Sequence, residues 1–99
     1  MQNKVKRFLD EYDLHCSKEI RYMDLVSEVG ELGKEIISGS EYGRISYSNT
    51  EALAEEVGDT LFSLLSLCCE LEVDAKEALD LALIKYQNRF AEKGFIDSK

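Results

Sequence analysis

The chain has 99 residues with six glycines and no proline, a composition that favours long helices over turn-rich β structure. This length allows one small domain near the lower limit for a self-sufficient core, so assembly with further copies is expected. The net charge of −8, from 20 acidic and 12 basic residues, gives no general electrostatic reason to bind nucleic acid or an anionic membrane.

Hydrophobic periodicity predicts two helices in the first half of the chain. The first runs from about Asn3 to Leu14. The second is capped by Ser17 and stops near Gly39, because glycine can take the left-handed conformation that ends many helices. Residues 40–49 are polar and predict a loop.

Two further helices are predicted after this loop. Ser48-x-x-Glu51 is a capping-box pattern that opens the third helix, which runs to about Leu71. Asp74 caps the fourth helix, and Gly94 closes it. No segment has the pattern of a strand, so the expected fold is an all-α bundle.

Neither membrane insertion nor export is predicted. The N-terminal residues 1–8 lack the apolar centre of a signal peptide, and the longest apolar-looking run, residues 61–69, is too short to span a bilayer. Cys16, Cys68 and Cys69 are odd in number and show no CxxC spacing. This pattern favours a reduced, cytoplasmic setting.

One acidic pattern occurs twice: EVGE at residues 28–31 recurs as EVGD at residues 56–59. Each copy places two carboxylates at i and i+3, about 60° apart around a helix axis. Two such helices packed side by side would bring four carboxylates together, which requires positive charge between them. Carboxylate oxygens favour Mg²⁺ or Mn²⁺. The pattern therefore predicts a divalent metal site at Glu28, Glu31, Glu56 and Asp59.

The surroundings of the pattern support this interpretation. A single acidic pair is more typical of a solvated helix face, but the repeated Val-Gly interior favours a built site. Asp24, Glu31 and Glu35 fall about 300° to 340° around the helix from Glu28, beside its apolar stripe. The repeated glycine predicts close helix contact on the opposite side of each helix.

With these residues, the chain resembles the MazG-like nucleotide pyrophosphohydrolases, the all-α NTP pyrophosphatase superfamily. The mark of that family is ExxE followed, after a spacer, by ExxD, and here 24 residues separate Glu31 from Glu56. The resemblance extends from about Phe8 to Phe95. It implies that residues 1–99 form a single MazG-like domain with a four-helix bundle-like fold, assembled as an oligomer.

The resemblance also implies an activity: Mg²⁺-dependent hydrolysis of a nucleoside triphosphate between the α- and β-phosphates, which gives a monophosphate and pyrophosphate. This would be nucleotide-pool housekeeping. Mg²⁺, for which Mn²⁺ can substitute, would be bound by Glu28, Glu31, Glu56 and Asp59. Bound metal lowers the pKa of an attacking water, and either Glu31 or Glu55 would serve as general base. The sequence decides neither this choice nor the preferred base and sugar.

Lys85, Arg89 and Lys93 recur every four residues and form a basic stripe on the fourth helix. The family often carries a Lys/Arg pair late in this helix, so the stripe would bind substrate phosphates; a solvated helix face is an equal alternative. The chain departs from the family in having Ser27, where many relatives have glutamate, and no tryptophan for a base pocket. His15, the one histidine, is expected at a helix end without a functional role.

Two other classes of helical protein compare with this acidic pattern. A ferritin-like di-iron bundle would require ExxH pairs, which the chain lacks. A non-catalytic helical oligomerisation or partner-binding module derived from the same fold would use the helices without chemistry.

Assembly is expected because the third helix is apolar on more than one side, with Phe62 and Leu67 outside its main stripe. A homodimer or a tetramer of two dimers would cover these residues, and Phe62→Glu should then disrupt assembly and activity together. The family resemblance implies nucleotide sites near the subunit contact.

Overall fold

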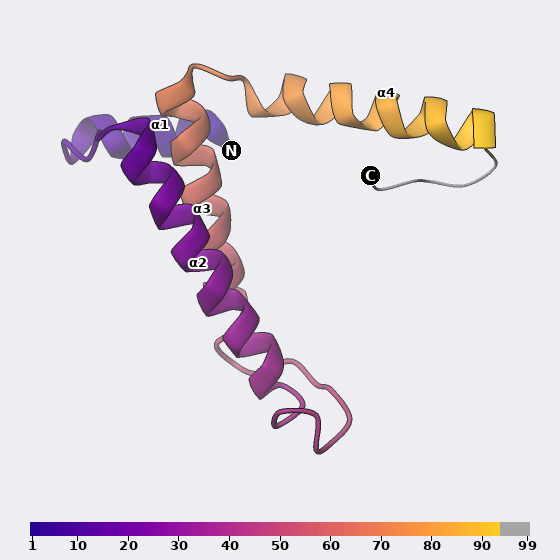
Figure 1. Ribbon diagram of the computed structural model, residues 1–99. Coiled ribbons are helices and arrows are strands. Elements are labelled where there is room, and N and C mark those ends of the chain that lie inside the picture. Colours follow the sequence, from indigo (N-terminus) through magenta and orange to yellow (C-terminus); the bar gives the residue numbers. More distant parts are fainter. Residues whose placement is uncertain (94–99) are drawn as a thin grey trace.

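A computed structural model describes residues 1–93, which form four α-helices and contain no strand (Figure 1). The helices are α1 (Gln2–Glu11), α2 (Lys18–Ser38), α3 (Leu53–Leu71) and α4 (Ala75–Lys93). The all-α prediction is therefore confirmed. No helix within these residues combines the length and the apolar content that crossing a bilayer would require.

Two of the predicted helix caps form. The hydroxyl of Ser17 accepts a hydrogen bond from the backbone N–H of Ile20 at 3.2 Å, which satisfies a donor of the first turn of α2. The carboxylate of Asp74 accepts from the N–H of Glu77 at 3.0 Å and does the same for α4. The predicted closure at Gly94 lies outside the described residues.

The first helix is shorter than predicted. It ends at Glu11 rather than Leu14, because the chain reverses at Asp13, whose φ of 54° is left-handed. The carbonyl of Leu9 then accepts the N–H of Leu14 at 2.9 Å. Residues 12–17 thus form a tight linker that turns the chain from α1 into α2.

Gly39 ends α2 for a different reason than predicted. Its φ of −61° is right-handed, so the expected left-handed conformation is wrong. A Cβ atom at this position would lie 2.5 Å from Cε1 of Tyr47 and 2.6 Å from the carbonyl oxygen of Ser48. Glycine is needed here because the loop folds back against the end of α2.

The same contact explains why the predicted capping box is absent. The N–H of Ser48 donates to the carbonyl of Gly39 at 3.0 Å, which holds Ser48 at the end of α2. Helix α3 instead begins at Leu53, after Ala52, which has no side chain capable of capping. The prediction of a Ser48–Glu51 cap was wrong because a tertiary contact of the loop outcompetes it.

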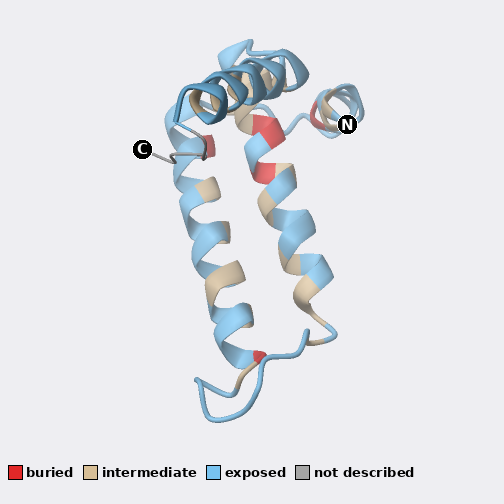
Figure 2. Cartoon of the chain, turned by 90° about the vertical axis from the view of Figure 1, so that its right-hand side faces the viewer, coloured by how far each residue is buried: buried red, intermediate tan, exposed pale blue. Residues whose placement is uncertain are grey.

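Helices α2 and α3 form a long antiparallel hairpin, and α1 lies across the end of α3 (Figure 1). Most of the few buried residues gather near this crossing, where Leu9 and Ser66 are fully buried, and Gly39 is buried at the opposite end of the hairpin (Figure 2). The ring of Phe8 packs edge-to-face on Phe62, with centroids 5.9 Å apart. Phe62 is therefore covered partly by α1 of its own chain.

Helix α4 leaves the hairpin and makes little contact with the other helices (Figure 1). The side-chain amide of Gln2 fixes the bend before it: Nε2 donates to the carbonyl of Val73 at 2.7 Å, and Oε1 accepts from the N–H of Ala75 at 2.6 Å. The large apolar side chains of α4 are exposed, namely Leu79, Leu81, Leu83, Ile84 and Phe90. Exposed apolar side chains in this number are typical of a helix that packs against a further surface.

The repeated glycines do not make the predicted close contact within one chain. A Cβ atom at Gly30 or at Gly58 would meet no atom of another residue within 4 Å. The faces of α2 and α3 opposite the acidic pattern are therefore open in the described part of the chain.

Candidate metal centre

Helices α2 and α3 bring three of the predicted acidic residues together. Glu28, on α2, and Glu56 and Asp59, on α3, each offer a carboxylate oxygen, and these three oxygens lie within 4.8 Å of one another. We call these three residues the acidic group. Glu28 and Glu56 are half-buried and Asp59 is exposed, so the group is walled on one side by the hairpin and open to water on the other.

The electrostatics of the group favour a cation. The pKa of Glu56 is raised above its ordinary value of 4.5, first by burial and then by the negative charges of Asp59 and Glu28. Glu31 and Glu35 raise it further. A hard divalent cation would relieve this repulsion, and the all-oxygen donor set suits Mg²⁺ or Mn²⁺.

Glu31 and Glu55 lie beside the acidic group rather than in it. The carboxylate of Glu31 is 3.9 Å from Nζ of Lys34 on the same helix, yet its charge acts on Glu56. Both side chains of this pair are largely exposed, which leaves Glu31 able to change rotamer. Glu55 is exposed and precedes Glu56 in α3, about 100° away around the helix.

Thr60 joins the two helices at the level of the acidic group. Its hydroxyl donates to the carbonyl of Glu56 at 2.9 Å and lies 3.3 Å from the carbonyl of Glu28 across the hairpin. The sequence offered no signal for this role, because threonine in a helix commonly bonds the carbonyl four residues earlier.

Glu35 extends the acidic edge of α2 beyond Glu31. Its carboxylate accepts a hydrogen bond from the hydroxyl of Thr50, which ties the end of the loop to α2. Helix spacing predicted that Glu35 lies beside Glu31. It did not predict the hydrogen bond with Thr50, which lies 15 residues away in the sequence.

The basic stripe of Lys85, Arg89 and Lys93 lies on α4, away from the acidic group of the same chain (Figure 1). Asp59 is 12 residues before the end of α3, a rise of about 18 Å along the helix, and α4 begins beyond that end. Nζ of Lys85 lies 4.9 Å from the centroid of the Tyr86 ring, and Cζ of Arg89 lies 5.9 Å from it. The described chain therefore does not bring the stripe to the acidic group.

The chain is similar to known proteins both in sequence and in structure. The family model of the MazG nucleotide pyrophosphohydrolase domain matches residues 17–92. The uncharacterized protein YpjD of Bacillus subtilis strain 168 is 30% identical over 93 residues, which cover 90% of this chain and 82% of that protein. The crystal structure of YpjD, described as a candidate pyrophosphatase, matches with a TM-score of 0.73 and 29% identity, over 89% of this chain and 90% of that one. The residues that the family model matches include the whole α2–α3 hairpin and its acidic group.

Proposed function

Because the chain belongs to the family of MazG nucleotide pyrophosphohydrolases, we propose that it hydrolyses a nucleoside triphosphate between the α- and β-phosphates. The products are a nucleoside monophosphate and pyrophosphate. The observation that carries this proposal is the acidic group of Glu28, Glu56 and Asp59, built on the hairpin that the family model spans. Free cysteines at 16, 68 and 69 suit the reduced cytoplasm, where such an enzyme would act on the nucleotide pool.

Glu28, Glu56 and Asp59 would hold Mg²⁺ in the proposed enzyme, and Glu31 would be the fourth ligand. Mn²⁺ can take the place of Mg²⁺, since both prefer oxygen ligands. When bound, the cation neutralises phosphate charge and lowers the pKa of the attacking water. The raised pKa of Glu56 supports this assignment, because it reflects crowded negative charge that a cation would offset.

The proton of the attacking water needs an acceptor, and Glu31 and Glu55 are the two candidates. Glu31→Gln should weaken Mg²⁺ binding as well as the rate, since Glu31 is also a proposed ligand. Glu55→Gln should lower kcat at an unchanged Mg²⁺ requirement if Glu55 is the base. A Mg²⁺ titration of pyrophosphate release for each variant separates the two roles.

The basic stripe completes the site from a second copy of the chain. Within one chain α4 stands away from the acidic group, and its apolar side chains, such as Leu81, are exposed. A basic stripe and an acidic group attract each other. The assembly is a homodimer or a tetramer of two dimers, in which Lys85, Arg89 and Lys93 bind substrate phosphates.

Mixing inactive variants tests this sharing of the site. Glu56→Gln and the double variant Arg89→Ala/Lys93→Ala should each be inactive alone. Dissociating and reassembling an equal mixture should restore about a quarter of the wild-type activity, because half of the dimers are mixed and each holds one intact site. A mixture of Glu28→Gln with Glu56→Gln is the control and should restore nothing. No recovery in the first mixture would mean that the stripe does not act from the second copy.

Single variants of the stripe test its contact with phosphate. Arg89→Ala and Lys93→Ala should each raise KM for a triphosphate more than they change the Mg²⁺ requirement, because they meet phosphate rather than metal. Unchanged kinetics in both variants would assign the stripe to a solvated helix face.

The activity itself is tested with a panel of canonical and modified nucleoside triphosphates in the presence of Mg²⁺ or Mn²⁺. Pyrophosphate release from at least one of them, abolished by chelation of the metal, is the expected result. A non-catalytic helical module would release none, and its thermal stability would not respond to millimolar Mg²⁺. That pair of results would replace the proposed enzyme with the alternative.

A further inference from the structure

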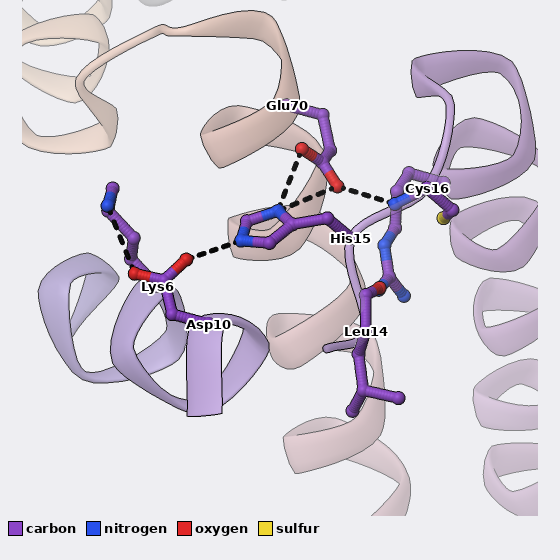
Figure 3. Close-up of polar contacts among 7 residues, drawn as sticks. Lys6, Asp10, Leu14, His15, Cys16 and Glu70 are labelled. Atoms are coloured by element: carbon purple, nitrogen blue, oxygen red, sulfur yellow. Dashed lines mark hydrogen bonds and ion pairs between the residues drawn. The ribbon is translucent and has the colours of Figure 1, made fainter. Parts of the chain in front are cut away.

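His15, in the linker between α1 and α2, bridges two carboxylates, one on α1 and one on α3 (Figure 3). Its Nε2 lies 2.5 Å from Oδ1 of Asp10 at the end of α1. Its Nδ1 lies 3.1 Å from Oε1 of Glu70 in the last turn of α3. The imidazole therefore forms a direct polar link between the end of α1 and the end of α3.

The linker around His15 is pinned at successive residues. The N–H of Cys16 donates to Oε2 of Glu70 at 2.9 Å, and the buried guanidinium of Arg21 donates to the carbonyl of Leu14. Glu70 is well covered, with 13% of its side chain exposed, whereas the His15 ring is 39% exposed. A proton can thus reach the ring from solvent while its partner on α3 is held in place.

The protonation state of the ring decides how many of these contacts are favourable. A protonated imidazole donates from both nitrogens, so it can serve Asp10 and Glu70 together. A neutral imidazole donates from only one nitrogen, and the lone pair of the other nitrogen then faces a carboxylate oxygen. Loss of the proton replaces a charge-assisted hydrogen bond with a repulsive contact, whichever tautomer forms.

We propose that His15 is a proton-operated clamp: the protonated ring holds α1 against α3, and loss of the proton loosens α1. The start of α1 is held separately, by the hydrogen bonds of Gln2 with Val73 and Ala75, so the clamp acts on the other end of the helix. Leu9 is its one buried residue, and Phe8 packs on Phe62 of α3. A loosened α1 uncovers Phe62, which is one helical turn from Asp59 of the acidic group.

The charged groups around the ring favour its protonated form. From α1, Asp10 faces the ring and is paired with Lys6, whose Nζ lies 3.2 Å from the second carboxylate oxygen. From α3, Glu70 faces it, with Cys69 adjacent in sequence. From α2, the positive charge of Arg21 acts on Glu70. Two carboxylates thus contact the ring directly. The cations Lys6 and Arg21 act on these carboxylates.

The pKa shifts give the direction of the pH dependence. The pKa of His15 is raised above 6.5, first by the hydrogen bond with Asp10 and then by that with Glu70. A raised folded-state pKa means that the stabilisation is complete below 6.5 and is lost as the pH rises through the folded value. The pKa of Glu70 is lowered, first by the N–H of Cys16, so this carboxylate remains ionised throughout that range.

The first test is an NMR titration of the full wild-type chain. His15 is the only histidine, so its ring C2–H signal needs no assignment by mutation. The midpoint should lie above 6.5, and the backbone amide signals of Leu9 and Asp10 should shift with the same midpoint. A midpoint at or below 6.5, or α1 signals that do not follow the ring, would overturn the clamp.

Matched variants separate the clamp from a static contact. Glu70→Gln keeps an acceptor for Cys16 but removes the charge, so it should move the His15 midpoint down; Glu11→Gln, the neighbour of Asp10, should leave it unchanged. His15→Gln can donate at all pH values, so the difference in Tm between wild type and His15→Gln should be largest below 6.5 and should shrink as the pH rises through the folded-state pKa of His15. A difference independent of pH would contradict the proposal, which does not rest on enzymatic activity.

Discussion

At the scale of single residues, Glu56 lies at a half-buried position among other acidic side chains. Burial and the charges of Asp59, Glu28, Glu31 and Glu35 all raise its pKa. Removing one negative charge from this group should therefore stabilise the metal-free protein rather than destabilise it. A ligand role and a structural role for Glu56 thus predict opposite effects of substitution on stability.

The stability of the metal-free protein should depend on pH through Glu56. Because the folded-state pKa of Glu56 is raised, its contribution favours folding below 4.5 and is lost as the pH rises through the folded value. In the absence of metal, wild type should therefore lose stability relative to Glu56→Gln over this range. Urea unfolding of both proteins at several pH values measures the difference, and saturating Mg²⁺ should reverse its sign. Equal pH dependence of the two proteins would contradict the assignment.

At the scale of helices, the sequence was informative where the signal is local. Hydrophobic periodicity predicted the four helices, and the caps at Ser17 and Asp74 form because each reaches a backbone N–H only three residues away. The capping box at Ser48 fails because Ser48 binds Gly39, a contact made by the folded loop. Propensity and short motifs do not encode such competition.

The direction of α4 is likewise set by a distant residue. Gln2 holds the bend through Val73 and Ala75, which lie 71 and 73 positions along the chain. For the site, the repeated motif predicted the convergence of Glu28, Glu56 and Asp59, since helix spacing places each pair on one face. The links through Thr60 and Thr50 depend on how the hairpin packs and could not be read from spacing.

Gly39 lies where the loop packs against the end of α2. Gly39→Ala should destabilise the protein by about 1–3 kcal/mol, because the added Cβ would meet the ring of Tyr47 and the backbone of Ser48. Gly33→Ala is the matched control: that helical position is open, so alanine should stabilise by about 0.5–1 kcal/mol. Urea unfolding measures both. A harmless Gly39→Ala would mean that the loop does not lie against α2.

At the scale of the whole molecule, the isolated position of α4 is the dominant feature. A helix with Leu79, Leu81, Leu83, Ile84 and Phe90 exposed requires cover that its own chain does not provide within residues 1–93. The acidic group and the basic stripe are separated within the chain for the same reason. Assembly through α4 would cover these apolar side chains and would bring the basic stripe to the acidic group of a second copy.

Leu81→Glu tests this assembly. The side chain of Leu81 is 69% exposed in the single chain, so a charge there should not disturb its fold but should break an interface made by α4. We expect monomers in sedimentation and a loss of pyrophosphate release of at least about tenfold. Phe62→Glu is a less selective variant, because Phe62 also contacts Phe8 of the same chain. A fully active 11.3 kDa wild-type monomer would contradict the assembly.

The identity of the products tests the central claim most directly. ³¹P NMR of a reaction with Mg²⁺ and the best triphosphate distinguishes pyrophosphate and monophosphate from orthophosphate and diphosphate. We predict the first pair for wild type, and a rate lower by at least about tenfold for Glu56→Gln, which keeps its fold because only one crowded charge is removed. Glu51→Gln, an exposed acid outside the acidic group, should match wild type. Orthophosphate as the first product would contradict cleavage between the α- and β-phosphates. Full activity of Glu56→Gln would contradict the assignment of that cleavage to the acidic group.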